Sequence, residues 1–162
     1  MTKISIGRLR PHFLTICKPD YSKPGLCEDE WGFQKFVDGE DEEICLGLEA
    51  NGGNTTTAML YEARLSFVSG HSSLSFFSAT FLIIYLQARL SNFPQVESIY
   101  IRTFYKVTKV VRPIVQFSLA SLALWISLTR ISDYFHHPVD VAAGGLIGIL
   151  FACITLLGMF LE

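Results

Sequence analysis

The sequence predicts an all-α integral membrane protein, a bundle of about three transmembrane helices joined to a polar outer lobe. Three apolar runs without a charged residue lie at residues 72–88, 113–129 and 141–161. Each run is close to the roughly 17–25 residues that a helix needs to cross a bilayer. The acidic residues are concentrated before the first run, and basic residues lie between the first two. This segregation predicts polar segments on opposite sides of a membrane.

The first 71 residues form the predicted outer lobe. Residues 1–16 are basic and amphipathic, whereas residues 17–65 have no clear period and hold most of the acidic residues of the chain. We therefore predict a loop-rich lobe. Asn54-Thr55-Thr56 is a glycosylation sequon within this lobe, which predicts a glycan on Asn54 if the lobe faces the lumen or the cell exterior.

The four cysteines are divided between the lobe and the membrane. Cys153 lies in an apolar run, whereas Cys17, Cys27 and Cys45 lie in the lobe. If the lobe faces an oxidising compartment, one disulfide is expected among these three. The sequence does not choose the pair, and three free thiols are the alternative.

The three apolar runs are best explained as membrane helices. The third run is the longest and contains Gly144-x-x-x-Gly148, a small-residue pattern that lets two membrane helices pack closely. The second run is short and contains the polar Gln116, so its helix has room to extend at either end. Buried helices of a soluble bundle are the alternative, and the absence of charge from all three runs disfavours it.

The membrane orientation follows from residues 89–112, which we predict to be a cytoplasmic loop. A single Glu97 is present there against the basic residues Arg89, Arg102, Lys106, Lys109 and Arg112. Excess positive charge marks the cytoplasmic side, so the lobe and residues 129–140 belong to the outer side. This topology explains the basic residues without nucleic-acid binding, which we do not expect. Because three helices make a small bundle, we also expect this chain to be the C-terminal half of a larger membrane protein.

Three short segments on the predicted outer side carry residues suited to binding phosphate. A phosphate monoester is dianionic, and fixed cations and helix N-terminal amides stabilise such charge. Guanidinium groups offer bidentate contacts and an ammonium group a point contact. Ser69 and Gly70 precede the first apolar run, where a hydroxyl and a close backbone approach are available. The candidate phosphate ligands are therefore Lys3, Arg10, Ser69, Gly70 and Arg130.

The same segments contain candidates for a phosphohistidine mechanism. His136 precedes Asp140 by four residues, so the two share a face if a helix has begun there. Asp140 would then orient the imidazole and leave its other nitrogen to attack phosphorus. His71 is the candidate general acid for the leaving alkoxide and later the base for water. We expect no metal and no cofactor, because the fixed cations supply the positive charge.

Each candidate also has a purely structural explanation. Lys3 and Arg10 suit a juxtamembrane basic segment, and His71 suits a helix start capped by neighbouring serines. His136 and His137 resemble a metal-binding pair, although adjacent histidines point in different directions. Asp140 suits a surface turn or a favourable helix N-terminus. The phosphate hypothesis is preferred because every required role occurs on one predicted membrane face.

At these residues the chain resembles the type 2 phosphatidate phosphatase superfamily, which also includes haloperoxidases. The family signature is K-x6-R-P, then P-S-G-H, then S-R-x5-H-x3-D. The first part is complete from Lys3 to Pro11. The second reads Val68-Ser69-Gly70-His71, with valine replacing proline, and the third reads Thr129-Arg130 followed by His136 and Asp140, with threonine replacing serine. Nearby segments resemble the animal lipid phosphate phosphatases in particular.

The resemblance implies a six-helix fold, of which this chain is the second half. It implies that His136 is the nucleophile, Asp140 its partner and His71 the general acid. It further implies magnesium-independent hydrolysis of phosphatidate, lysophosphatidate, sphingosine 1-phosphate and ceramide 1-phosphate at the outer or lumenal face. A homo-oligomer, a plasma-membrane location and a glycan between the first two motifs are also implied. The methyl group of Thr129 is expected to crowd the phosphate site.

Two other functions are compatible with parts of the sequence. A phosphatase for soluble esters such as sugar phosphates shares the chemistry, but the membrane-level site and the lipid-branch segments argue against it. A non-catalytic membrane protein that binds lipid phosphates or acts as a scaffold is the alternative from a different class. The retention of His71, Arg130, His136 and Asp140 favours the enzyme.

Overall fold

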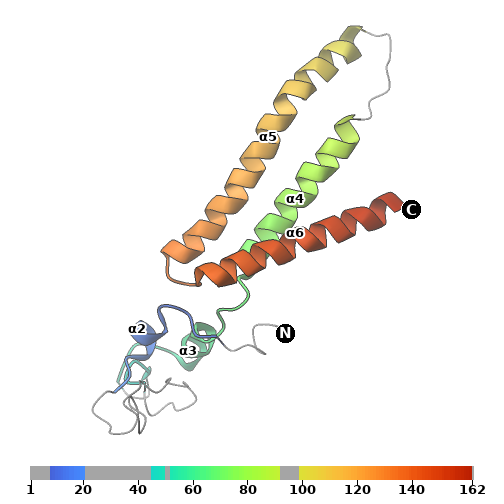
Figure 1. The fold of residues 1–162 in the computed structure, drawn as a ribbon. Helices are drawn as coiled ribbons and strands as arrows, with labels where there is room; N and C mark the ends of the chain where they lie inside the picture. Colours follow the sequence, from blue (N-terminus) through green and yellow to red (C-terminus); the bar gives the residue numbers. More distant parts are fainter. Residues whose placement is uncertain (1–7, 21–44, 50–51, 92–98, 162) are drawn as a thin grey trace. The chain divides into compact units, whose positions relative to one another are not determined.

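The computed structural model describes residues 8–20, 45–49, 52–91 and 99–161. The chain is divided into two compact units, each described by itself below. The lobe unit comprises Met1–Phe67 with Tyr134–His137, and the helix unit comprises Val68–Asp133 with Pro138–Glu162. Among the described residues, the lobe unit contains two short helices and the helix unit three long ones, which are labelled in Figure 1. In the described ranges the β structure consists of isolated bridges only, which agrees with the predicted all-α class.

The lobe unit is built around a small apolar core. Helix α2 (Phe13–Cys17) and helix α3 (Thr57–Ala63) contribute side chains to it from distant parts of the sequence. Thr56 caps α3, because its hydroxyl accepts a hydrogen bond from the Met59 amide at 3.3 Å. Residues 17–65 were expected to form loops, so the helix at residues 57–63 corrects that prediction. The buried core residues are Phe13, Cys17, Cys45, Leu48, Leu60 and Ala63.

A disulfide joins Cys17 to Cys45 across 28 residues, which confirms the expectation of one disulfide in the lobe and identifies its pair. The backbone reinforces this link, since the Gly47 amide donates to the Cys17 carbonyl at 2.9 Å. Cys27 lies outside the described residues, and Cys153 is a free, half-buried thiol in the helix unit. Asn54 is exposed, and its glycosylation stays a prediction.

Removing this disulfide is expected to destabilise the lobe unit without unfolding the long helices. Cys17 and Cys45 are both fully buried in the lobe core, and a loop of this length contributes about 2–4 kcal/mol when closed by a disulfide. We expect the double variant Cys17→Ser/Cys45→Ser to be cleaved faster by trypsin within residues 1–67. Cys153→Ser is the control and should be cleaved at the wild-type rate. Equal cleavage of all three proteins would contradict this assignment.

The helix unit consists of α4 (Gly70–Ser91), α5 (Ile99–Ser132) and α6 (Pro138–Leu161). All three helices are long and apolar enough to cross a membrane, as the sequence predicts. Many of their large apolar side chains are exposed, as expected for helices that face lipid. Examples of such exposed side chains are Phe117, Trp125, Leu150, Phe151 and Ile154.

Helix α5 is longer than predicted. A loop was predicted at residues 89–112 and a helix at 113–129, whereas α5 begins at Ile99 and continues through Pro113. Proline lacks the backbone N–H that would bond four residues earlier, so it interrupts one hydrogen bond but does not require the helix to end. The basic residues of this segment therefore lie on a helix that continues directly into the apolar run.

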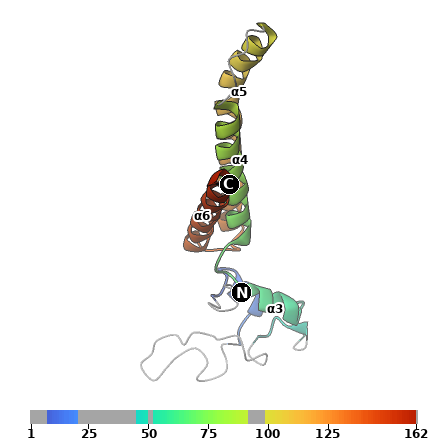
Figure 2. The same cartoon turned by 90° about the vertical axis from the view of Figure 1, so that its right-hand side faces the viewer.

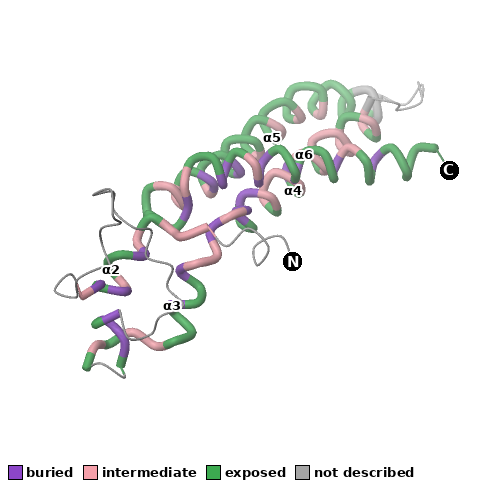
Figure 3. Tube along the Cα trace, turned by 60° about the horizontal axis from the view of Figure 1, so that its bottom comes forward, coloured by how far each residue is buried: buried purple, intermediate pink, exposed green. Residues whose placement is uncertain are grey.

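The close packing of α6 on α4 depends on three glycines. A Cβ at Gly144 would lie 2.6 Å from the Ser69 carbonyl oxygen, and one at Gly148 would meet the backbone of Ser73. Gly145 lies against the ring of Phe76. Buried positions recur along α6 between exposed ones (Figure 3). The turned view in Figure 2 also places α4 and α6 side by side, so the glycine pattern marks a real helix contact.

Candidate active site

The candidate residues are divided between the two units. Arg10 and His136 belong to the lobe unit, and Lys3 lies outside the described residues. The predicted pairing of His136 with Asp140 joins the two units and stays a prediction. The helix unit holds Ser69, Gly70, His71, Arg130 and Asp140.

Within the lobe unit, the first motif is held against the segment that carries His136. The ring of His137 lies with Nε2 3.1 Å from the Leu9 carbonyl oxygen. The ring of His12 lies with Nδ1 2.8 Å from the Tyr134 carbonyl oxygen. These pairs are separated by more than 120 residues of sequence, so the fold itself creates this part of the site.

His136 is almost fully buried, with 4% of its surface exposed. Its Nδ1 lies 3.5 Å from the hydroxyl oxygen of Ser66, at the long limit for a hydrogen bond. The Ser66 amide donates to the Arg8 carbonyl at 2.9 Å, which fixes the serine beside the first motif. Sequence reasoning did not identify Ser66 as a site residue, because nothing local marks a serine 70 residues from its partner. His136 and His137 contact different groups, which disfavours their interpretation as a metal pair.

Arg10 is held by a carboxylate and an aromatic ring. Its Nη2 lies 3.3 Å from Oε2 of Glu62, and its guanidinium carbon lies 5.9 Å from the centre of the Phe135 ring. Burial lowers the pKa of the Arg10 guanidinium, and the nearby Glu62 partly opposes that effect. Glu62 is mostly exposed, so water screens the pair and its contribution to stability is small. These contacts hold the Arg10 guanidinium beside Phe135, the residue that directly precedes the candidate nucleophile His136.

Tyr134, two residues before His136, adopts a left-handed backbone conformation with φ of 57°. This conformation costs about 1–2 kcal/mol in a residue other than glycine. Strained backbone of this kind persists where surrounding contacts impose it, and it is concentrated at functional sites. The contact of its carbonyl oxygen with His12 is one such restraint.

In the helix unit, hydrogen bonds tie together the N-termini of α4 and α6 and the C-terminus of α5. The Ser69 amide donates to the Asp140 carbonyl at 3.2 Å. The Ser72 hydroxyl donates to the Val141 carbonyl at 2.8 Å and accepts from the Ser127 hydroxyl at 3.2 Å. Two helix N-termini, each with partial positive charge, therefore lie at the same end of the unit.

Two polar side chains at this end, those of Ser69 and Asp140, are fully buried. The Ser69 hydroxyl is fully buried and, within the described part of the chain, has no hydrogen-bond partner. Asp140 is also fully buried, which excludes its interpretation as a surface carboxylate. The Ser72 hydroxyl donates to the Val141 carbonyl in α6, so it does not serve as one of the serines that cap α4. An unpaired buried hydroxyl is costly and suits a site completed by a ligand.

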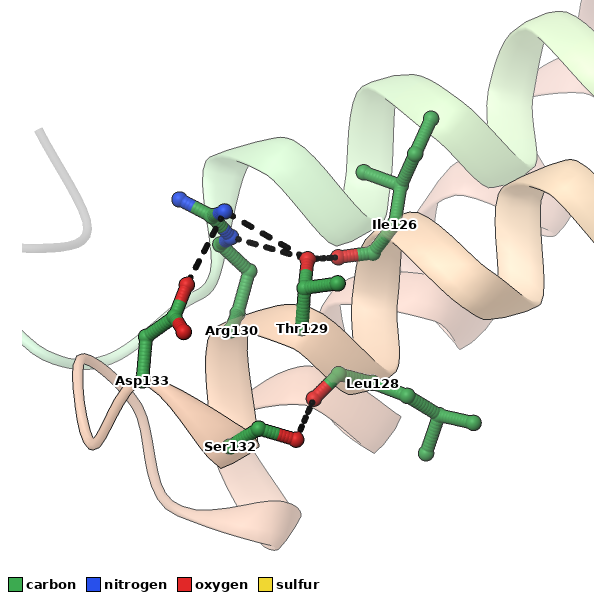
Figure 4. A network of polar contacts seen from close by, with 6 residues as sticks. All are labelled: Ile126, Leu128, Thr129, Arg130, Ser132 and Asp133. Atoms are coloured by element: carbon green, nitrogen blue, oxygen red, sulfur yellow. Dashed lines mark hydrogen bonds and ion pairs between the residues drawn. The ribbon is translucent and has the colours of Figure 1, made fainter.

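Arg130 lies in the last turn of α5 within a local polar network (Figure 4). Its Nη2 lies 3.3 Å from Oδ2 of Asp133, and its Nε and Nη2 each lie 3.4 Å from the Thr129 hydroxyl oxygen. The Thr129 hydroxyl in turn donates to the Ile126 carbonyl at 2.7 Å. The threonine that replaces the family serine therefore contacts the arginine through its oxygen and holds it at the helix end.

Gly70 and His71 form the first turn of α4 and are exposed. A Cβ added at Gly70 would meet nothing within 4 Å, so the protein itself does not require glycine there. The open space agrees with the expectation that a ligand approaches the backbone at this position.

We expect Gly70→Ala to leave folding intact and to weaken substrate binding. The added methyl group contacts no protein atom but occupies the space beside the helix amides. Thermal unfolding in detergent should match the wild type, while KM for a phosphate ester should rise several-fold. Gly158→Ala is the control, since its added Cβ also meets nothing within 4 Å and it lies near the other end of α6. A loss of stability in Gly70→Ala alone would contradict this interpretation.

Among residues 8–20, 45–49, 52–91 and 99–161, no group of three or more histidine, cysteine, aspartate or glutamate side chains is placed to hold a metal ion. The chemistry that these residues offer is positive charge, helix amides, a buried hydroxyl and imidazole. Such groups bind and transfer phosphate.

The fold and these residues define a helical membrane protein with a candidate anion-binding site at one end of its helices. Residues 1–161 match the family model described as the PAP2 superfamily, and the chain belongs to that family. It is 39% identical over 155 residues to mouse phospholipid phosphatase 2 and 38% identical over 157 residues to rat phospholipid phosphatase 1. A Drosophila melanogaster protein whose name contains the words phosphatidate phosphatase is 38% identical over 155 residues.

These similarities cover 96–97% of this chain but only part of each relative. The chain spans 45% of the length of the mouse and rat proteins and 35% of the Drosophila protein. No solved structure matches the chain.

Proposed function

We propose that this chain supplies the catalytic half of a lipid phosphate phosphatase, an enzyme that hydrolyses lipid phosphate monoesters without magnesium through a phosphohistidine. The observation that carries the proposal is the set of polar groups gathered at one end of the helix unit. Two helix N-termini and the side chain of Arg130 lie there. The buried hydroxyl of Ser69, which has no hydrogen-bond partner among the described residues, lies there too. Membership of a family whose relatives are named phosphatases supports the same reading.

The phosphate dianion is bound by the cations Lys3, Arg10 and Arg130 together with Ser69 and the backbone at Gly70. Guanidinium groups match two phosphate oxygens at once, and helix amides add donors that do not titrate. The negative charge that develops on the equatorial phosphate oxygens in the transition state is then stabilised by groups that are already in position.

In the first step, His136 attacks phosphorus and the bond from phosphorus to the lipid oxygen breaks. Because Nδ1 of His136 faces Ser66, we assign the attack to Nε2. Asp140 stabilises the positive charge that develops on the imidazole, and His71 donates a proton to the departing alkoxide. The products are the lipid alcohol and a phosphohistidine.

In the second step, His71 accepts a proton from water, and the resulting hydroxide attacks phosphorus. The bond from phosphorus to nitrogen breaks, and inorganic phosphate leaves with His136 restored. One water is consumed, and His71 returns to its starting protonation state. Every group required for both steps is therefore supplied by this chain.

The proposed substrates are phosphatidate, lysophosphatidate, sphingosine 1-phosphate and ceramide 1-phosphate. The proposed site faces the cell exterior or a lumen, because the basic residues near the start of α5 mark the other side as cytoplasmic. Assembly into a homo-oligomer, a plasma-membrane location and glycosylation of Asn54 belong to the same proposal.

The test is release of phosphate in detergent micelles that contain a metal chelator. It compares phosphatidate, sphingosine 1-phosphate and glucose 6-phosphate as substrates. Two proteins are assayed, namely this chain alone and this chain joined to the N-terminal part of the rat relative. The proposal expects release from the lipid esters by the joined protein at rates well above those from the sugar ester.

No release from a folded joined protein would overturn the phosphatase proposal and favour a lipid-binding or scaffold role. Faster release of phosphate from the sugar ester would support the phosphatase reaction but would overturn the proposal that lipids are its substrates. Activity of this chain alone would further establish that its three helices suffice.

A further inference from the structure

We propose that His12 is a positioning residue of the phosphatase, because its ring N–H holds the turn before His136 in the conformation that presents the nucleophile. The inference rests on the proposed function, since it concerns the placement of His136. His12 directly follows the first motif and belongs to the lobe unit, as do Tyr134 and His136. Its Nδ1 lies 2.8 Å from the Tyr134 carbonyl oxygen. This contact connects the first motif to the turn that carries His136.

The partner of His12 determines where its ring carries a proton. A carbonyl oxygen accepts hydrogen bonds but cannot donate them, so Nδ1 of His12 must be the donor. His12 directly precedes α2, yet its side chain makes no capping hydrogen bond to that helix. Capping is the usual role of a polar side chain at this position. The His12 side chain therefore serves a distant segment and not its own helix.

The turn at Tyr134 needs a restraint of this kind. Helix α5 ends at Ser132, and Tyr134 follows it with φ of 57°. Helices commonly end in this left-handed conformation, but the residue there is usually glycine, because a Cβ is crowded by the following carbonyl. Tyr134 is 68% exposed, so its side chain is not packed in a core that could impose the conformation. We therefore assign that restraint to the hydrogen bond on its carbonyl oxygen.

Further contacts hold the same two segments together. The rings of His12 and Phe135 are in edge-to-face contact, with centres 5.1 Å apart and an angle of 83° between the planes. The Arg10 guanidinium carbon lies 5.9 Å from the centre of the same Phe135 ring. Nε2 of His137 lies 3.1 Å from the Leu9 carbonyl oxygen. These contacts run in opposite order along the two segments, which are thus held in one register.

The register matters because it relates a proposed phosphate ligand to the proposed nucleophile. Arg10 precedes His12 by two residues, and His136 follows Tyr134 by two. A change in the turn would move the His136 imidazole relative to the phosphate that Arg10 binds. Displacement of a reacting group by about 1 Å can reduce a rate by about a hundredfold. His12 therefore acts through the Tyr134 carbonyl and needs no contact with the substrate.

The test compares two substitutions that separate the N–H of His12 from its ring. His12→Asn keeps a donor at the position of Nδ1 but loses the ring, whereas His12→Phe keeps a ring and loses the donor. Phosphate release is measured on the protein joined to the N-terminal part of the rat relative. We expect His12→Phe to lower kcat about tenfold and to change KM by about twofold or less. His12→Asn should stay within about twofold of the wild-type kcat, because its amide replaces the lost donor.

A second measurement reports the position of His136 without requiring catalytic activity. Diethyl pyrocarbonate modifies accessible neutral imidazoles, and His136 is almost fully buried. Peptide mass spectrometry of this chain in detergent should show that His136 is modified several-fold faster in His12→Phe than in the wild type or in His12→Asn. If none of the proteins releases phosphate, the modification rates still test the positioning of His136. The proposed function and the role of His12 can therefore fail separately.

Substitution of Tyr134 tests whether His12 acts through the backbone of the turn. Asparagine adopts the left-handed conformation more readily than tyrosine or alanine. In the His12→Phe background, Tyr134→Asn should therefore restore most of kcat and slow the modification of His136, whereas Tyr134→Ala should do neither. Equal effects of His12→Phe and His12→Asn would overturn the proposal, as would wild-type behaviour of His12→Phe in both measurements. A Tyr134→Asn variant that restores no more than Tyr134→Ala would overturn it as well.

Discussion

Replacement of His136 by alanine is expected to abolish phosphate release from lipid substrates. The imidazole is the proposed attacking group, and loss of a nucleophile typically reduces kcat by about 10⁴-fold or more. The measurement is phosphate release by the protein joined to the N-terminal part of the rat relative. Brief incubation with a radioactive lipid phosphate should also label the wild-type protein. That label should be lost in acid and retained in base, as expected for a bond between phosphorus and nitrogen.

His137→Gln is the matched control for this experiment. His137 is the adjacent histidine, but its Nε2 faces the Leu9 carbonyl oxygen and has no assigned chemical role. The change should reduce the rate by at most about tenfold and still allow labelling. A labelled His136→Ala protein, or a label stable to acid, would exclude His136 as the nucleophile.

The second large effect is expected for Gly148→Ala, which should destabilise the helix unit. The added Cβ would collide with the backbone of α4 at Ser73 and lie 2.9 Å from the Phe77 nitrogen. Backbone cannot move aside as a flexible side chain can, so α6 must shift away from α4. Overpacking of this kind typically costs about 1–3 kcal/mol. Unfolding by sodium dodecyl sulfate, followed by circular dichroism, should begin at a lower denaturant fraction.

Gly158→Ala provides the comparison on the same helix. Its added Cβ has no heavy atom within 4 Å, and alanine favours a helix over glycine by about 1 kcal/mol. Unfolding of Gly158→Ala should therefore match the wild type or require more denaturant. The same destabilisation in both variants would show that glycine flexibility, and not close contact, determines the stability of α6.

The helices of this fold were largely predictable because their signals are local. The uncharged runs identified three membrane helices, and the spacing of Gly144 and Gly148 identified a packing face. The full extent of α5 was not predictable in the same way. Proline is favoured in the first turn of a helix and disfavoured in its interior, so Pro113 indicated a helix start. The hydrogen bond from Gln116 to α4 depends on tertiary structure.

The residues of the candidate site could be proposed from the sequence, whereas their arrangement could not. Charge and imidazole at recognisable spacings marked Arg10, Arg130 and His136 as candidates, and their roles stay predictions. The contact between Ser66 and His136 joins residues 70 positions apart, and no local pattern marks it. The left-handed conformation of Tyr134 was equally hidden, because tyrosine has no preference for it.

The hydrogen bond from the Ser69 amide to the Asp140 carbonyl has a practical consequence for mutagenesis. It joins main-chain atoms only, so it can form whatever side chains occupy the two positions. Ser69→Ala and Asp140→Asn keep both main-chain atoms, so we expect this link between the second and third motifs to persist in both variants. A loss of the proposed activity in either variant would then point to the missing hydroxyl or charge. Side chains at these helix ends can therefore be replaced and tested one at a time.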